Sequence, residues 1–333
     1  MEPVRWGVIG TAAIAIRRVI PATQASAEAE VRAIASRDLA KAETAAHDLG
    51  IPRAYGSYEE LFADPEIEAV YNPLPNHLHI DWSIKAMEAG KHVLCEKPLA
   101  LTAAEAARLI EARERTGRQV EEAFMCRNHP QWQKVRELIA EGRIGRVRAV
   151  QASFTYVNAD PDDIRNQVES GGGGIYDIGS YCITMSRYVF DAEPRRVVAL
   201  VERDPGFGTD RLTSALLDFE DGQASFLCGT QVTRHQHLFI FGTEGWMRLE
   251  APFVQPPTHA CRIAVGSGLY PGHAADETIE LDPVNHYTLQ SERFGRLVRG
   301  LEAESWPIET GVANMAVIDA LFRSAESGGW ETV

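Results

Sequence analysis

The stretch Arg5-Trp6-Gly7-Val8-Ile9-Gly10-Thr11-Ala12-Ala13-Ile14-Ala15 runs from an apolar segment through a glycine turn into a helical pattern. Residues 5–9 predict a strand, and residues 14–25 predict a helix. The turn occupies the place of G-x-G-x-x-G/A, where backbone N–H groups and a helix N-terminus face a pyrophosphate. Ala12 replaces the middle glycine, and its methyl group should push the phosphate outward or demand a shifted turn. By itself the turn fits a plain β–α connection equally well.

The alternation of strand and helix continues through the first third of the chain. Further strands are predicted at residues 31–35, 69–71, 92–95 and 119–123. Helices are predicted between them at residues 39–49, 58–63, 79–89 and 102–116. Because β–α–β crossovers are right-handed, this order predicts a doubly wound parallel sheet. We therefore expect residues 1–124 to form an α/β dinucleotide-binding domain of the Rossmann type.

From residue 125 onward the pattern changes. After a helix at 130–141, alternating apolar residues predict strands at 147–156, 196–202, 213–219, 223–230, 237–242 and 246–250. Hairpin turns such as Glu220-Asp221-Gly222 favour a large, open and mostly antiparallel sheet. Helices at 180–190, 287–300 and 310–324 are expected to cover one face of it. Residues 125–333 are thus predicted to be an α+β domain for substrate binding and oligomerisation.

Composition excludes several classes of partner and compartment. The formal net charge of −14 over 333 residues argues against nucleic acid or an anionic membrane as the main partner. The five cysteines are scattered without C-x-x-C spacing, which predicts neither a disulfide framework nor a zinc site. The sequence shows no secretory signal and no segment apolar enough to span a bilayer, so we expect a cytoplasmic protein.

Two stretches carry candidate catalytic chemistry. Lys97, in Cys95-Glu96-Lys97-Pro98, follows an apolar run and should stand at the carboxyl end of a strand, where open α/β sheets bind ligands. Tyr181 ends Asp177-Ile178-Gly179-Ser180-Tyr181 in a predicted helix, about one turn after Asp177. Taken separately, Lys97 fits an exposed surface lysine and Tyr181 fits a packing residue as well as a functional one.

The end of the second predicted strand indicates which nicotinamide cofactor is bound. NAD enzymes of this fold place an acidic residue there for the ribose hydroxyls, whereas this chain reads Ala35-Ser36-Arg37-Asp38. Arg37 can grip a 2′-phosphate through charge-assisted hydrogen bonds, and Ser36 can donate another. The sequence favours NADP. In the alternative, Arg37 is a solvated surface residue and Asp38, whose more natural place is the N-cap of the next helix, takes the ribose.

Four stretches in order carry a family resemblance. They are Gly7-Val8-Ile9-Gly10-Thr11, Tyr71-Asn72-Pro73-Leu74-Pro75-Asn76-His77-Leu78-His79, Glu96-Lys97-Pro98, and Gly171-Gly172-Gly173-Gly174-Ile175-Tyr176-Asp177-Ile178-Gly179-Ser180-Tyr181. The sequence resembles the Gfo/Idh/MocA oxidoreductases over their full two-domain length. A tyrosine in place of histidine at the last position resembles the branch containing glucose-fructose oxidoreductase, NADP-dependent D-xylose dehydrogenase and dimeric dihydrodiol dehydrogenase.

The resemblance implies roles for named residues. Tyr181 would be the acid/base, assisted by Lys97, whose ammonium favours the phenolate, and Asp177 would hold a substrate hydroxyl or orient Lys97. Substrate contacts are expected from Lys97, Arg165, Asn166, Asp177 and Tyr181. Cofactor contacts are expected from Gly10, Thr11, Ala12, Ile14, Ser36, Arg37, Pro73, Leu74, Asn76, His77, Glu96, Lys97, Arg127 and Tyr287. Nothing in the sequence pairs His77 and His79 as metal ligands, and no metal is expected.

These expectations converge on an NADP(H)-dependent oxidoreductase acting on a polyhydroxylated substrate. The leading reaction is oxidation of a pyranose aldose at C1 to a lactone, or the reverse reduction of a sugar carbonyl. Oxidation of a trans-dihydrodiol is the alternative within enzymes, and a catalytically silent NADP-binding regulator is the alternative outside them. Pocket walls for a sugar or a diol are expected from Phe124, Trp132, Phe154, Tyr156 and Phe253. A homodimer or homotetramer is expected to form through the exposed face of the second sheet.

Overall fold

The computed structural model describes residues 2–267, 274–303 and 306–333, and these form two compact units. The first unit comprises the described residues of 1–128 and 285–312, and the second those of 129–284 and 313–333. The predicted boundary after residue 124 therefore lies four residues before the break at Asn128, and residues 285–312, which we expected in the second domain, belong to the first unit.

A parallel sheet forms the centre of the first unit, as the alternation of strand and helix predicts. Among the described residues it has six strands in the order β3-β2-β1-β4-β5-β6, all paired in parallel. The strands are β1 Val4–Ile9, β2 Ala29–Ala35, β3 Arg53–Tyr55, β4 Ala69–Asn72, β5 His92–Glu96 and β6 Val120–Ala123. The three-residue strand β3 was not predicted, because it is short and only half-buried at the edge of the sheet.

Helices of the first unit begin where the sequence supplies caps. Asp38, Ser57 and Thr102 each accept the N–H of the residue three positions on, and so start the next helices. These helices are α2 Leu39–Leu49, α3 Tyr58–Ala63 and α5 Ala103–Thr116, while α4 spans His79–Glu88. The helix after β1 opens with a π-helix, η1 Ala15–Val19, and continues as α1 Ile20–Gln24. Two short 3₁₀ helices, η2 Asn76–Leu78 and η3 Met125–Asn128, follow β4 and β6.

Helix α8, His286–Val298, packs within the first unit, which corrects the expectation that it covers the second sheet. Its buried Phe294 lies against the ring of Trp6 on β1, with ring centroids 5.5 Å apart. Arg293 forms a bidentate ion pair with the fully buried Glu121 of β6. An amphipathic pattern predicts that a helix buries one face but not which surface receives it, and here the apolar face of β1 and β2 does.

The second unit is built on a mixed sheet. Among the described residues its nine strands have the order β14-β13-β12-β11-β7-β10-β9-β8-β15. They are β7 Val147–Val157, β8 Arg196–Arg203, β9 Asp210–Asp218, β10 Gln223–Gly229, β11 Gln231–Gly242, β12 Trp246–Leu249, β13 Cys261–Gly266, β14 Glu277–Leu281 and β15 Glu331–Thr332. Only β7 and β10 pair in parallel among these neighbours, so the mostly antiparallel prediction is confirmed.

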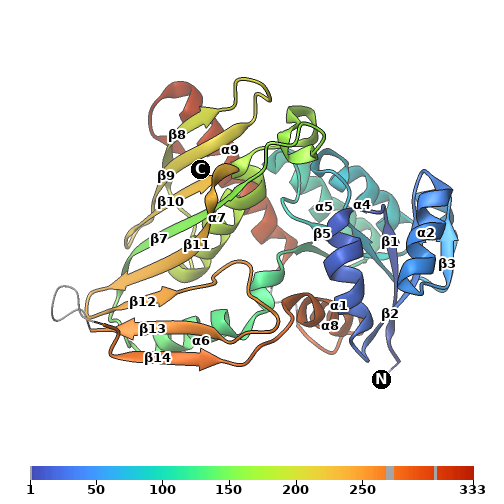
Figure 1. The fold of residues 1–333 in the computed structure, drawn as a ribbon, viewed down its shortest axis with the longest axis horizontal. Helices are drawn as coiled ribbons and strands as arrows, with labels where there is room; N and C mark the ends of the chain where they lie inside the picture. Colours follow the sequence, from blue (N-terminus) through green and yellow to red (C-terminus); the bar gives the residue numbers. More distant parts are fainter. Residues whose placement is uncertain (1, 268–273, 304–305) are drawn as a thin grey trace. The chain divides into compact units, whose positions relative to one another are not determined.

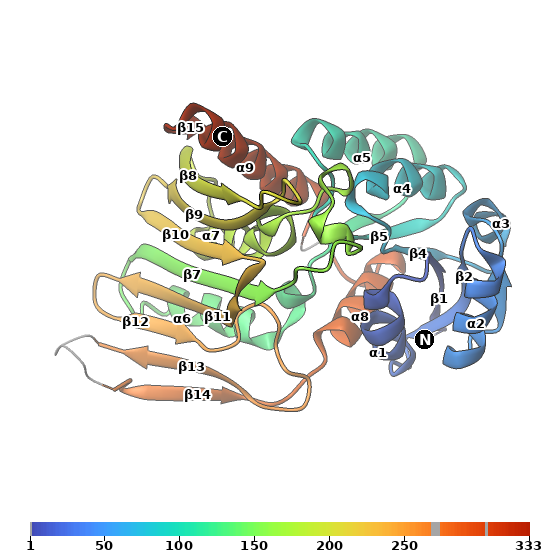
Figure 2. The ribbon, with the colours of Figure 1, turned by 45° about the horizontal axis from the view of Figure 1, so that its top comes forward.

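Helices pack on one face of this sheet (Figures 1 and 2). Helix α6, Pro130–Ala140, contacts β13, and α7, Ser180–Phe190, contacts β7 and β10. Helix α9 spans Ile308–Ser327 and belongs to this unit from residue 313. The stretch before α7 holds the 3₁₀ helices η4 Ile164–Asn166 and η5 Val168–Ser170 and the π-helix η6 Ile175–Gly179. In the part of the chain that the structure describes, no helix has the length and hydropathy of a membrane span.

Candidate functional site

Predicted cofactor residues lie at one edge of the parallel sheet, where the carboxyl ends of its strands meet. Gly10 to Ile14 follow β1, Ser36 and Arg37 follow β2, and Pro73 to His77 follow β4. Glu96 ends β5, Lys97 comes directly after it, and Arg127 follows β6. The strand order reverses direction between β1 and β4, which is the switch point where such sheets bind ligands. The topology thus brings these residues to a common edge, and their binding roles remain predictions.

The glycine turn has the conformation of a tight β–α connection. Gly10 has φ of +94°, and a Cβ at that position would lie 2.9 Å from Cδ2 of Leu74. Its N–H donates to the carbonyl of Ala35 at 2.7 Å, which ties the end of β1 to the end of β2. Ala12 lies outside the positive-φ region, so alanine fits the backbone there. The helix then opens as the π-helix η1.

The end of β2 separates the roles of Asp38 and Arg37. The Asp38 carboxylate accepts the N–H of Lys41 at 3.4 Å as the N-cap of α2, and its own N–H donates to Oγ of the buried Ser36 at 3.2 Å. Arg37 is exposed and interacts with the hydroxyl of Tyr58. Burial raises the pKa of Tyr58, and the charge of Arg37 opposes that rise. The acidic residue is therefore engaged as a cap, while the guanidinium stands at the surface beside the strand end.

A fully buried histidine joins the loop after β4 to the loop that contains Lys97. His79 Nε2 lies 2.7 Å from the carbonyl oxygen of Leu74, and Nδ1 lies 2.9 Å from that of Pro98. The Lys97–Pro98 peptide bond is cis. Burial lowers the pKa of His79 to about 4 although both carbonyls oppose this, so the ring is neutral at pH 7 and donates through one nitrogen. This contact fixes the backbone immediately after Lys97.

Glu96 is held by two donors. The Tyr71 hydroxyl donates to Oε1 at 2.6 Å, and the N–H of Lys97 donates to Oε2 at 3.2 Å. Burial raises the pKa of Glu96, and Tyr71 and Lys97 oppose the rise. Tyr287, at the start of α8, lies near enough for the charge of Glu96 to add to the raising effect of burial on its pKa. Glu96 and Tyr287, both predicted to contact the cofactor, thus share one neighbourhood with Tyr71.

Arg127 occupies a different environment from the one we expected. Its guanidinium is 4.6 Å from the ring of Trp306 and 4.7 Å from that of Phe124, and it forms an ion pair with Glu122 at 3.5 Å. Only 4% of the residue is exposed. A buried cation held between two rings and a carboxylate stabilises the fold around η3. The predicted cofactor contact of Arg127 remains a prediction.

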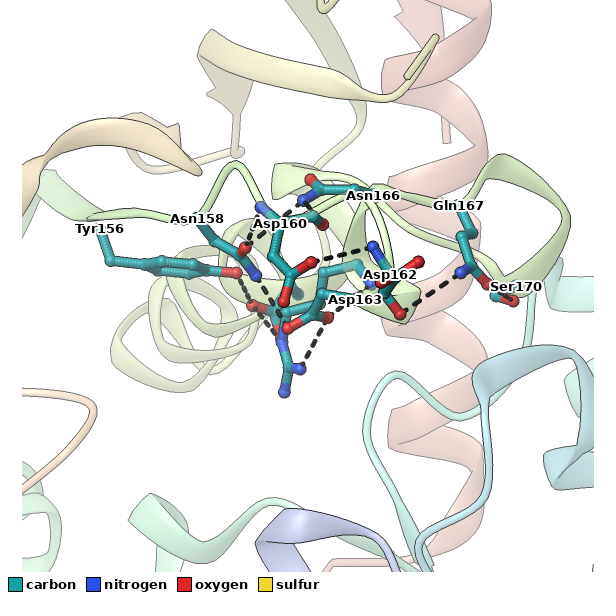
Figure 3. A network of polar contacts seen from close by, with 10 residues as sticks. Tyr156, Asn158, Asp160, Asp162, Asp163, Asn166, Gln167 and Ser170 are labelled. Carbon is teal, nitrogen blue, oxygen red and sulfur yellow. Dashed lines mark hydrogen bonds and ion pairs between the residues drawn. The ribbon is translucent and has the colours of Figure 1, made fainter. Parts of the chain in front are cut away.

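In the second unit, Asp177 takes part in a polar network, of which Figure 3 labels Tyr156, Asn158 and Asp163. Oδ2 of Asp177 accepts from the Tyr156 hydroxyl at 2.5 Å and from Nε of Arg165 at 3.2 Å. Nη1 of Arg165 also donates to Asp163 at 3.2 Å. The charge of Asp177 raises the pKa of Arg165, and burial followed by Asp177 raises that of Tyr156. The structure therefore brings the predicted substrate residues Asp177 and Arg165 into contact, and it shows Tyr156, predicted only as a pocket wall, as a second donor to Asp177.

Asn166 braces the loop that carries Arg165. Its Nδ2 donates to the carbonyl of Asp160 at 2.8 Å and to Oδ1 of Asn158 at 3.4 Å, and the residue is 4% exposed (Figure 3). The amide nitrogen is thus used inside the loop, and the predicted substrate contact of Asn166 remains a prediction.

Tyr181, in the first turn of α7, is surrounded by aromatic rings. Phe154 meets it edge to face with centroids 5.5 Å apart, and Phe253 lies 5.9 Å away. Phe154 and Phe253 stack on each other at 5.2 Å. The main chain at Phe253 is fixed because Gln236 accepts its N–H at 3.1 Å and Trp132 donates to the carbonyl of the preceding residue at 2.8 Å. Two of the five predicted pocket aromatics therefore orient the ring of Tyr181.

Comparison with known proteins identifies the chain. Residues 4–124 match the family model described as an oxidoreductase family with an NAD-binding Rossmann fold, and residues 132–248 match that of the GFO/IDH/MocA C-terminal domain. The chain belongs to the Gfo/Idh/MocA oxidoreductase family. It is therefore an oxidoreductase with an NAD(P)-binding Rossmann domain, as the resemblance implies.

Similar members of the Gfo/Idh/MocA family cover the whole chain. An oxidoreductase of Rhizobium meliloti named ORF334 is 51% identical over 100% of both chains. D-xylose 1-dehydrogenase (NADP(+)) 2 of Haloferax volcanii is 39% identical over 97% of this chain and 98% of its own. Among solved structures, the 3-ketoreductase KijD10 of Actinomadura kijaniata in complex with NADP and TDP-benzene is 31% identical, with a TM-score of 0.89 over 97% and 98% of the two chains.

Contacts that the sequence did not predict complete the picture of this Gfo/Idh/MocA chain. Tyr71 holds Glu96, Tyr156 holds Asp177, and Asp210 contacts the glycine run before η6. Tyr71 opens one of the quoted motifs, so its place in the motif was a usable signal. The contacts of Tyr156 and Asp210 join residues 21 and 35 positions apart, and no local pattern reports them.

Proposed function

We propose that this protein is an NADP(H)-dependent oxidoreductase that transfers hydride between the nicotinamide and a sugar. The leading reaction is oxidation of a pyranose aldose at C1 to a lactone, or the reverse reduction of a sugar carbonyl. The observation that carries this proposal is that the start of one helix, η6–α7, bears both Asp177 and Tyr181. Tyr156 and Arg165 hold the Asp177 carboxylate, and Tyr181 has a hydroxyl that can move a proton.

The proton chemistry follows from the residues. Oxidising an alcohol removes its hydroxyl proton, and we assign that step to Tyr181. Because tyrosine titrates near ~10, it needs a cation to act near neutral pH, and we assign that role to the Lys97 ammonium. Asp177 would hold a second substrate hydroxyl and so fix which carbon reacts. NADP(H) bound at the edge of the parallel sheet would accept or supply the hydride.

The choice of NADP over NAD rests on the end of β2. Asp38 caps α2, so the acidic side chain is already engaged, while Arg37 is exposed and Ser36 lies beside it. A guanidinium and a hydroxyl suit a 2′-phosphate. The Haloferax volcanii relative is named as an NADP(+)-dependent D-xylose 1-dehydrogenase, and KijD10 was crystallised with NADP; both agree with this choice.

The charge of the loop before Asp177 favours an uncharged substrate. Residues 158–170 carry Asp160, Asp162, Asp163 and Glu169 against the single cation Arg165, which is already paired with Asp163 and Asp177. A sugar joined to a diphosphate would meet net negative charge here, at a cost that a free sugar avoids. We therefore favour a free aldose over a sugar nucleotide.

A second candidate reaction is oxidation of a trans-dihydrodiol. The stacked rings of Phe154 and Phe253 beside Tyr181 favour it, because they offer an apolar wall to a carbocyclic diol. Trans-1,2-dihydrobenzene-1,2-diol dehydrogenase of Mus musculus is 32% identical over 74% of each chain. The same proton-transfer pair would serve both substrates.

The experiment is a substrate panel with the purified protein. Absorbance of reduced nicotinamide is followed with NADP and then NAD, against free aldoses, trans-dihydrodiols and a dTDP-linked sugar. The proposal predicts turnover with NADP and an aldose. Turnover confined to a diol would select the second candidate. Tight NADP binding without turnover of any alcohol, or of any sugar carbonyl with NADPH, would indicate a binding protein and overturn the proposal.

We also propose that the protein forms a homodimer or homotetramer through the face of the large sheet opposite α6 and α7. This face exposes the apolar side chains Leu200, Leu216, Leu227 and Phe241. We expect a Leu216→Lys, Leu227→Lys variant to sediment as a smaller species, while Leu301→Lys, which changes an exposed leucine of the first unit, does not. A monomeric parent protein would contradict this proposal.

A further inference from the structure

Asp210 is a buried acid that faces the start of the helix carrying Asp177 and Tyr181. It opens β9, and only 1% of it is exposed. Its Oδ2 accepts the N–H of Ile175, the first residue of η6, at 2.7 Å. The hydroxyl of Thr213 donates to the same oxygen at 3.5 Å. The carboxylate therefore lies at the positive end of the η6–α7 helix, where an anion is favoured.

The glycine run before η6 leaves room for this carboxylate. Gly173 has φ of +119°, and a Cβ there would lie 2.0 Å from Oδ1 of Asp210. At Gly174 a Cβ would lie 3.2 Å from Oδ2. Gly173 is thus required because Asp210 approaches its backbone, and Gly174 leaves little room for a side chain.

The same run contacts the loop that holds Asp177. The N–H of Gly173 donates to the carbonyl of Arg165 at 2.9 Å, and a Cβ at Gly172 would lie 2.5 Å from that carbonyl oxygen. The run is consequently enclosed by Asp210 on one side and by the backbone of Arg165 on the other. A shift of the run would move both Arg165 and the helix on which Asp177 and Tyr181 stand.

We infer that Asp210 is a positioning residue that fixes the start of the η6–α7 helix and thereby sets the orientation of Asp177 and Tyr181. The catalytic part of this inference rests on the proposed function, because it takes Tyr181 as the acid/base. The structural part, that Asp210 fixes residues 173–181, does not.

The ionisation of Asp210 supports this role. Burial raises its pKa to about 7, and the N–H groups of Ile175 and Gly174 and the charge of Arg203 oppose the rise. The thiol of Cys228 also faces Asp210: burial raises the pKa of Cys228 well above its usual value, and the charge of Asp210 adds to that rise. Above pH 7 the ionised carboxylate is the stronger acceptor for the helix N–H groups. We therefore expect kcat to rise between about pH 6 and pH 8 as Asp210 ionises.

The test compares Asp210→Asn and Gly173→Ala with Asp64→Asn, which alters a buried carboxyl of the first unit that also accepts a backbone N–H. Amide hydrogen exchange, nicotinamide binding and the pH profile of kcat are measured. Asp210→Asn and Gly173→Ala should speed exchange in residues 173–181 by about tenfold or more, because a charged acceptor is lost or displaced. Asp210→Asn should also lower kcat by about tenfold, leave nicotinamide binding unchanged and abolish the rise near pH 7. Asp64→Asn should do none of these.

Failure of the proposed function and failure of the inference about Asp210 give different experimental results. If the parent protein turns over no sugar or diol, the proposed function fails, and hydrogen exchange still tests the anchor. If exchange in residues 173–181 is the same in Asp210→Asn and the parent protein, the inference fails whether or not the protein is active. If exchange accelerates while kcat and its pH profile are unchanged, Asp210 does not position the catalytic groups and the inference is overturned.

Discussion

The hydroxyl of Tyr156 lies 2.5 Å from Oδ2 of Asp177, and Arg165 donates to the same oxygen. Two donors from different segments, β7 and η4, thus fix one carboxylate oxygen. Their convergence holds the orientation of the carboxyl plane, which a single donor would leave free to rotate. If Asp177 binds a substrate hydroxyl, the Tyr156 hydroxyl sets where that substrate lies.

Removing the Tyr156 hydroxyl should therefore weaken substrate binding and orientation. We expect Tyr156→Phe to lower kcat/KM by roughly 10–100-fold, because a hydrogen bond to a charged group contributes about 1.5–3 kcal/mol. Steady-state kinetics with the best substrate of the panel measure this. Tyr188→Phe is the matched control, because Tyr188, like Tyr156, is a half-buried tyrosine of the same unit, and it donates to the carbonyl of Trp132 at 3.3 Å. Equal losses in both variants would show that Tyr156 acts only through the fold.

His79 should be required for the placement of Lys97. We expect His79→Gln to weaken NADPH binding and to lower kcat, because the loops at Leu74 and Pro98 lose their common contact. The control is His92→Gln, since His92 is a partly buried histidine at the opposite end of β5 whose Nδ1 accepts the N–H of Gln119. Calorimetry and nicotinamide fluorescence separate stability from binding. A His79→Gln protein that binds NADPH and turns over like its His92→Gln counterpart would refute this role.

Arg37 should distinguish the two nicotinamide cofactors. Replacing it with alanine should raise the Kd for NADPH by roughly 10–100-fold, as expected for the loss of a charge-assisted hydrogen bond to phosphate. The Kd for NADH should not change. Lys41→Ala, which removes an exposed cation from the next helix, controls for general electrostatics. Equal weakening of NADPH and NADH by Arg37→Ala would be inconsistent with a contact to the 2′-phosphate.

Asp210 should also leave a signature in the pH dependence of stability. Its pKa rises from an ordinary value of 3.8 to about 7 in the folded protein, so the native state binds the extra proton between these values. Stability from this group is full below pH 4 and falls as the pH rises toward 7, by on the order of 4 kcal/mol at most. Urea unfolding of the parent protein and Asp210→Asn across this range gives the difference. A difference that does not vary with pH would contradict the raised pKa.

Much of the fold follows from local pattern, because most strands and helices of the first unit are encoded by their own periodicity, and several of the helices by a side-chain cap; the short edge strand β3 is an exception. Three strands of the large sheet, β13, β14 and the two-residue β15, did not follow. Strand β14 is exposed and polar along most of its length, so it lacks the alternation that marks a half-buried strand. The position of α8 also required the structure, since an amphipathic helix does not specify its receiving surface.

The candidate site divides in the same way. Lys97, Glu96 and the glycine turn were predictable, because the carboxyl ends of parallel strands meet at one edge. The contacts of Tyr156 with Asp177 and of Asp210 with Ile175 were not predictable. They are set by the register of β7 and β9 beside the η6–α7 helix. The surroundings of Arg127 were not predictable either: the resemblance implies a cofactor contact, and the structure adds its burial between the rings of Phe124 and Trp306.

The central claim is that Tyr181 moves the substrate proton in an NADP-dependent oxidation. Its most direct test is the single-turnover rate of NADP reduction by the best substrate, in the parent protein and in Tyr181→Phe, with the Kd for NADPH measured in both. General acid–base catalysis contributes about 10²–10⁴-fold, so the rate should fall by that factor while the Kd is unchanged. A Tyr181→Phe protein that reduces NADP at the parent rate would contradict the claim.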